Sequence, residues 1–78
     1  VKYKKTRIEL YVISKVKQAR IEADMSQAEL AHRLDVTPGF IGKVESSNYS
    51  TKYNLNHLNK LGKIFRCNLT DFIPDEPL

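Results

Sequence analysis

The side chains that most often carry out catalysis or hold metals are few in this chain, and their spacing fits neither task. His32 and His57 lie far apart in the sequence, and neither has the spacing to the single cysteine, Cys67, that zinc ligands show. No glycine-rich phosphate loop and no nucleophile elbow occurs in the sequence. We therefore expect surface histidines, a buried structural thiol at Cys67, no catalytic residue, no metal and no cofactor.

The polar groups with a definite chemical use are concentrated in residues 26–45, SQAELAHRLDVTPGFIGKVE. Ser26 followed by Glu29 is the pattern of a capping box that begins one helix, and Thr37 followed by Pro38 begins a second. Two capped helices also follow one another in other small helical domains, but here a tight turn separates them and apolar residues recur on one face of each. These apolar residues are Leu30, Ala31, Leu34, Ile41 and Val44. The layout predicts a helix-turn-helix, whose second helix enters the DNA major groove.

Charge supports a polyanionic partner but does not prove one. The 78 residues carry 13 Lys and Arg against 9 acidic residues, for a net charge of +4. Basic residues dominate positions 1–20, whereas positions 67–78 carry acids and no base. The KYKK segment is equally compatible with a solvated tail. No segment has the length of a membrane span or the pattern of a signal peptide, so we expect a cytoplasmic protein without a membrane partner.

Five helices are expected, and no sheet. Residues 1–5 are predicted to form a flexible basic arm, and residues 6–78 a single domain. Capping patterns and helical periodicity place helices at about 7–22, 27–34, 38–46 and 55–65, with a polar loop at 47–54. Asn68 is expected to begin a short fifth helix that Pro74 ends.

From about Val12 to Ile73, the chain resembles the Cro/cI-type (XRE) family of phage and bacterial transcriptional regulators. The segment VKQARIEADMSQAELAHRLDVT resembles the first two helices of the family, FIGKVES its recognition helix, and LNHLNKLGKIFRCNLTDFI its last two helices. The most specific piece is SQAELA. The resemblance implies an all-α, five-helix lambda-repressor-like DNA-binding domain.

The resemblance fails at positions where the family usually has glycine and this chain has Asp24, Asp35, Ser47 and Arg66. Glycine is used there because those turns tend to require positive φ. Asp adopts this conformation at modest cost, so we expect positive φ at Asp35, and Asp24 can follow the same path. Asn48 is a candidate for the left-handed position in place of Ser47. At Arg66, either the helix at 55–65 ends in a different conformation from that of the family, or the backbone is strained by positive φ.

The resemblance also implies which residues meet DNA. The start of the helix at 27, with Ser26 and Gln27, is expected to bind phosphate through free N–H groups, although Gln27 can also be only a surface helix former. On the next helix, Lys43 is the only long donor and favours the O6 and N7 acceptors of guanine. Phe40 is expected either to contact DNA or to cover the core. The full set of expected DNA contacts is Ser26, Gln27, Thr37, Pro38, Gly39, Phe40, Gly42, Lys43 and Lys52.

Arg20 and Glu45 match a family pair that joins the first helix to the end of the recognition helix. We expect them to form a structural ion pair, with phosphate binding by Arg20 as the alternative. If the pair is buried, loss of one partner leaves an uncompensated charge.

Two functions are compatible with these features. The first is a sequence-specific regulator, with repression the expected role, that binds an inverted repeat in double-stranded DNA as a homodimer. The second is a protein-interaction module, an antitoxin or coactivator-like adaptor with weak DNA affinity. The second arises because Pro38, Gly39 and Gly42 leave the recognition face with few polar side chains. Binding of duplex DNA with a steep salt dependence distinguishes the first from the second.

Overall fold

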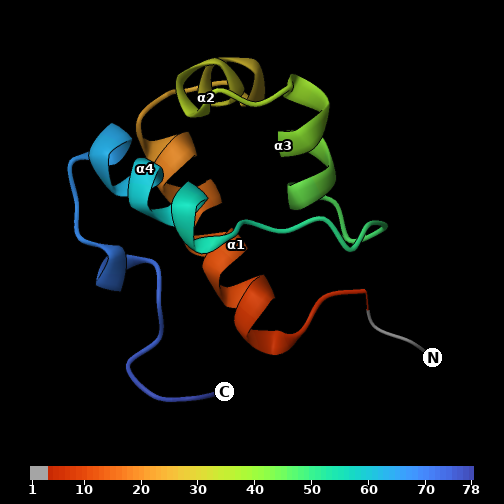
Figure 1. The fold of residues 1–78 in the computed structure, drawn as a ribbon, viewed down its shortest axis with the longest axis vertical. Coiled ribbons are helices and arrows are strands. Elements are labelled where there is room, and N and C mark those ends of the chain that lie inside the picture. The colour runs from red at the N-terminus through yellow and green to blue at the C-terminus, as the bar shows by residue number, and fades with distance from the viewer. Residues whose placement is uncertain (1–3) are drawn as a thin grey trace.

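The computed structural model describes residues 4–78, which form four α-helices and one short 3₁₀ turn (Figure 1). The helices are α1 (Arg7–Glu22), α2 (Gln27–Leu34), α3 (Pro38–Glu45) and α4 (Leu55–Phe65), and the turn is η1 (Leu69–Asp71). No strand occurs among the described residues. The all-α class expected from the sequence is confirmed, with a 3₁₀ turn in place of the fifth helix.

Side-chain capping explains where each α-helix begins. The hydroxyls of Thr6, Ser26 and Thr37 accept from backbone N–H groups three residues further on, at the starts of α1, α2 and α3. At the start of α4, the Asn54 amide oxygen accepts from the backbone N–H of His57, and the His57 ring accepts from the backbone N–H of Asn54. These bonds satisfy N–H groups that have no partner inside the helix.

Two capping details differ from expectation. Thr6 and Glu9 form a complete capping box, but at α2 only half of the box is present. The Glu29 carboxylate instead pairs with Arg33, one turn further along α2. At η1 the Asn68 side chain makes no cap; its backbone N–H donates to Asp71. The segment is therefore held by Asp71 and by burial of Phe72.

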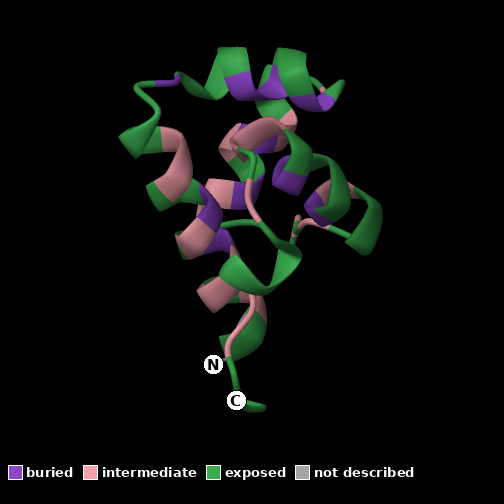
Figure 2. Ribbon diagram, turned by 90° about the vertical axis from the view of Figure 1, so that its left-hand side faces the viewer, coloured by how far each residue is buried: buried purple, intermediate pink, exposed green. Residues whose placement is uncertain are grey.

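The core lies where the inward faces of the four helices meet (Figure 2). Val16 of α1, Leu61 of α4 and Phe72 after η1 meet the apolar faces of α2 and α3 there. The largest side chains that are fully buried are Leu30, Ile41, Leu61, Val16 and Val44. Because all four helices contribute to one core, burial of a few residues fixes how α3 is presented.

At three of the four turns where the family usually has glycine and this chain does not, the residue has positive φ. Asp24, Asp35 and Arg66 have φ of 55°, 62° and 55°, and they are the described non-glycine residues with positive φ. Asp35 ends α2 in the left-handed conformation, as predicted, and Arg66 ends α4 in the same way. Ser47 and Asn48 are not among these residues, so the expectation that Asn48 takes the left-handed role is wrong.

The expected flexible arm is wrong at its last residue. Lys5 is 6% exposed and is hydrogen-bonded to the end of α3. Lys4 is exposed, and residues 1–3 of the expected arm lie outside the described residues. The cause is a tertiary contact: α3 ends at Glu45, one residue earlier than predicted, and the carbonyl groups at its end attract the Lys5 ammonium.

Candidate nucleic-acid interface

Helices α2 and α3 and the turn between them have the geometry that the helix-turn-helix pattern predicts. Ala31 is fully buried, and its carbonyl accepts the backbone N–H of Val36 in the turn at 2.9 Å. The left-handed Asp35 reverses the chain, and Thr37 then caps α3. Ile41 and Val44 are fully buried, so the opposite face of α3 is presented outward.

That outward face has the composition expected from the sequence. Thr37, Pro38, Gly39 and Lys43 are exposed, and Gly42 is half-buried. A Cβ atom at Gly39 would meet nothing within 4 Å, so a ligand can approach the backbone there. Lys43 is therefore the long polar side chain of this face.

Lys43 is oriented by an aromatic ring. Its ammonium lies 5.5 Å from the ring centroid of Tyr49, in the loop that follows α3. A cation over an aromatic face is attracted by the negative charge of the π system. This contact could not be predicted from the sequence, because tertiary contacts set the path of the loop.

Arg20 and Glu45 form the expected ion pair, in bidentate geometry. Arg20 Nε and Nη2 donate to the two Glu45 carboxylate oxygens, each at 2.9 Å, and Nη1 donates to the Met25 carbonyl at 2.8 Å. The Arg20 and Glu45 side chains are only 12% and 3% exposed. The pair thus links α1 and the turn after it to the last residue of α3.

Gln27 lies at the start of α2, as expected, but its amide also has an internal partner. Gln27 Nε2 donates to Glu45 Oε1 at 2.9 Å, which extends the ion pair into a three-residue network with Arg20. If Gly42 carried a Cβ atom, that atom would lie 3.7 Å from the Gln27 amide oxygen, which is ordinary van der Waals contact. Ser26 is used as the helix cap. The hydrogen bond from Gln27 to Glu45 therefore joins the start of α2 directly to the end of α3.

Lys52 also has an intramolecular partner that the sequence did not reveal. Its ammonium pairs with Glu9 of α1 at 2.7 Å. This bond to Lys52, together with the backbone N–H of Thr6, lowers the pKa of Glu9 from its ordinary value. Lys52 remains about half exposed, so it is available to phosphate only in competition with Glu9.

Phe40 packs against the core, which is one of its two expected roles, and its contact with DNA stays a prediction. It is half-buried, with ring centroids 5.0 Å from His57 and 6.2 Å from Tyr53. This aromatic cluster joins the start of α3 to the start of α4. Burial lowers the pKa of His57 and raises that of Tyr53, whose buried hydroxyl has no hydrogen-bond partner among residues 4–78.

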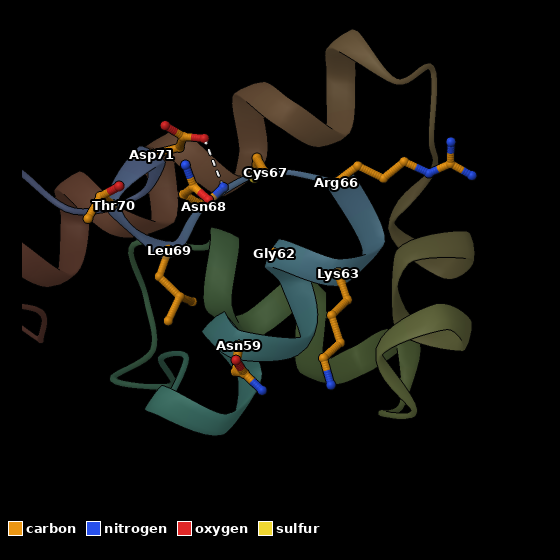
Figure 3. A pocket seen from close by; sticks show the side chains of 9 residues that line it. All are labelled: Asn59, Gly62, Lys63, Arg66, Cys67, Asn68, Leu69, Thr70 and Asp71. Atoms are coloured by element: carbon orange, nitrogen blue, oxygen red, sulfur yellow. Dashed lines mark hydrogen bonds between the residues drawn. The ribbon is translucent and has the colours of Figure 1, made fainter.

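A hollow lies away from α3, between the second half of α4 and η1, and has a volume of about 800 Å³ (Figure 3). Asn59, Leu69 and Asp71 line it together with Lys63 and Arg66, which extend away from Asp71 in different directions. No metal-binding group of three side chains occurs among the described residues, and none of their helices is both long and apolar enough to cross a bilayer.

Comparisons with known proteins agree with this geometry. Residues 16–72 match the sequence model of the family described as helix-turn-helix. The chain is similar in fold to a crystal structure of Fe(II) HppE in complex with a substrate, with a TM-score of 0.71 and 20% sequence identity. The match covers 85% of this chain but 36% of that one, so the likeness concerns one part of a longer chain. The comparison with curated proteins gave no match.

Proposed function

Because the chain belongs to the Cro/cI-type (XRE) helix-turn-helix family, a family of DNA-binding regulators, we propose that it is a sequence-specific transcriptional repressor. In this proposal, residues 6–78 act as one non-catalytic domain in the cytoplasm, and α3 enters the major groove of an inverted-repeat operator. The observation that carries the proposal is the outward face of α3, opposite the buried Ile41 and Val44 and fixed at its end by the Arg20–Glu45 pair.

The division of roles follows from the chemistry of each group. Lys43 reads base edges, and Gly39 allows the backbone to come close to the DNA. The start of α2 binds phosphate through N–H groups that have no partner within the helix, at the positive end of its dipole. Thr37 supplies a further hydroxyl. Lys52 binds phosphate by giving up its ion pair with Glu9 and pairing with the phosphate instead. These contacts separate base reading from sequence-independent affinity.

The sharpest test is selection of bound duplexes from a random DNA pool, followed by footprinting of the selected site. We expect an enriched palindrome whose two half-sites are protected together. Affinity for it should fall steeply as salt rises, because displaced counterions drive binding to phosphates. Enrichment of no sequence would contradict a sequence-specific regulator.

A second candidate is a protein-interaction module with weak DNA affinity. Pro38, Gly39 and half-buried Gly42 give α3 little hydrogen-bonding capacity, and Lys43 and Lys52 both have partners within the chain. For this candidate, duplex DNA should bind weakly or not at all even at low salt. Measurement of binding to random-sequence duplex across a salt series therefore separates the two functions.

A further inference from the structure

Lys5 is a buried charged residue outside the Arg20–Glu45 pair, and its ammonium lies at the end of α3. Its ammonium donates to the carbonyl of Lys43 at 3.1 Å and to the carbonyls of Val44 and Ser46. These bonds connect positions 38 to 41 residues apart in the sequence. In Figure 1 the described start of the chain lies beside the segment that leaves α3. The contact is thus tertiary and involves the helix proposed to read DNA.

The end of α3 lacks the usual means of satisfying its last carbonyl groups. Helices of this kind often end at a glycine in the left-handed conformation, whose N–H groups bond back to those carbonyls. Here Ser46 is extended, with φ of −91° and ψ of 139°, and neither Ser47 nor Asn48 has positive φ. The Lys43 carbonyl accepts the backbone N–H of Ser46 at 3.3 Å, and the last carbonyls of the helix form the negative end of its dipole, which favours a cation.

Lys5 supplies what this helix end lacks. An ammonium group has three N–H donors, and Lys5 directs them to three carbonyl oxygens. Burial alone disfavours the charged form and lowers the pKa of Lys5, whereas nearby Glu9 opposes that effect. The three bonds therefore compensate for the loss of water around the cation.

We propose that Lys5 is a positioning residue for DNA recognition, which clamps the end of α3 and so fixes Lys43 relative to the rest of the domain. The proposal rests on the proposed function. Two anchors then hold this end of the helix: Lys5 binds its backbone, and Arg20 binds the side chain of its last residue, Glu45. Lys5 does not contact phosphate, since its donors are already used.

A basic residue near the start of a DNA-binding domain could also act as a phosphate ligand, and salt dependence distinguishes the two roles. Loss of one phosphate contact lowers the slope of log affinity against log salt by about 1 and weakens all sequences alike. Loss of a clamp leaves the slope unchanged and lowers affinity for the selected site more than for random duplex.

The experiment compares Lys5→Met, which keeps the length of the side chain but removes the charge and donors, with Lys4→Met at the exposed neighbouring position. For Lys5→Met we expect roughly tenfold weaker binding to the selected site, an unchanged salt slope and a reduced ratio of selected-site to random-duplex affinity. Lys4→Met should leave that ratio unchanged, and Lys5→Arg should restore most of it because it keeps a cationic donor.

A reduced slope with an unchanged ratio, or no effect of Lys5→Met, would overturn the proposal. Circular dichroism of each variant without DNA verifies that it is folded, and Lys5→Gln, which keeps an N–H donor, replaces Lys5→Met if the latter does not fold. If the wild-type chain selects no DNA, the proposed function fails. Amide hydrogen exchange at residues 44–48 then tests the clamp by itself: faster exchange in the substituted protein is expected, and unchanged exchange excludes the clamp.

Discussion

At the scale of single residues, the left-handed conformation of three non-glycine residues is a local cost that substitution can remove. Asp35 has φ of 62° and Arg66 has φ of 55°. Side chains with a Cβ atom disfavour this conformation, and Asp tolerates it better than Arg because its short polar side chain can bond locally. Comparison with the family's glycine positions located both sites, but only the structure resolved the alternatives at Arg66.

We predict that Asp35→Gly is neutral or raises the free energy of unfolding by up to about 1 kcal/mol. Arg66→Gly should stabilise by at least as much, because Arg has no compensating local bond in this conformation. Chemical denaturation of both variants measures the change. A clear loss of stability in Asp35→Gly would mean that the Asp side chain holds the turn.

Lys43 provides a test of base reading. Lys43→Ala should weaken binding to the selected site by roughly 1–3 kcal/mol and relax the preference at one base pair in each half-site. The Gln27 amide donates to Glu45 in the free protein, and if it also contacts phosphate, Gln27→Ala should weaken binding to all sequences about equally. Competition binding with single-base variants of the site measures both effects. An unchanged ranking of sites for Lys43→Ala would exclude base reading by this residue.

Tyr49 should influence that reading through Lys43. Tyr49→Phe keeps the aromatic ring over which the ammonium lies, whereas Tyr49→Leu removes it. We expect the preference for the base pair read by Lys43 to persist in the first variant and to weaken in the second. If Tyr49→Phe instead lowers affinity for every duplex, the Tyr49 hydroxyl binds phosphate.

At the scale of elements, the sequence predicted most helix boundaries because they depend on local groups. The starts of α1 to α4 are set by side-chain caps three residues from their N–H partners, and the predicted bounds of α2 and α4 coincide with those observed. The sequence did not predict side-chain partners that lie in a different element of the fold. The partner of Lys5 is 38 to 41 residues away, and the Glu9–Lys52 and Gln27–Glu45 contacts join separate elements.

The Arg20–Glu45 pair orients α3 against α1, and we predict a large effect of breaking it. Glu45→Ala should lower the free energy of unfolding by roughly 3–5 kcal/mol, because it leaves the Arg20 charge buried without its partner. Glu29→Ala is the matched control. It breaks an ion pair whose side chains are 50% and 47% exposed, so it should cost at most about 1 kcal/mol. Equal effects in chemical denaturation would contradict a structural role for the buried pair.

The contact between Glu9 and Lys52 predicts a dependence of stability on pH. Because folding lowers the pKa of Glu9, the ionised carboxylate stabilises the folded state above its ordinary value of about 4.5. This contribution is lost as pH falls through the lower value of the folded state. Denaturation between pH 7 and 3 should show a smaller loss in Glu9→Gln, which can still cap Thr6, than in the wild type. If both proteins lose the same stability between pH 7 and 3, the Glu9 carboxylate does not contribute to the pH dependence.

At the scale of the whole molecule, the proposed pairing on DNA calls for exposed apolar surface, and Leu55 has the largest exposed fraction among the described large hydrophobic residues. It is 78% exposed at the start of α4, directly after the loop that follows α3. The C-terminal segment offers less apolar surface, because Phe72 is only 2% exposed and fills the core, and Leu69 is 39% exposed. We therefore propose that the homodimer forms through the 48–58 region.

We expect pairing, because one domain of this size would bury too little DNA surface to distinguish one site in a genome. In the proposed dimer, two copies related by a twofold axis would place their α3 helices about 34 Å apart, one turn of B-DNA, and so would require an inverted repeat. Leu55→Asn should weaken cooperative binding to the full site by about 1.5–3 kcal/mol while leaving half-site affinity and monomer stability nearly unchanged. Leu69→Asn is the control and should have a smaller effect. Footprinting of full and half-sites measures the difference, and protection of a lone half-site without cooperativity in the wild type would eliminate the dimeric repressor.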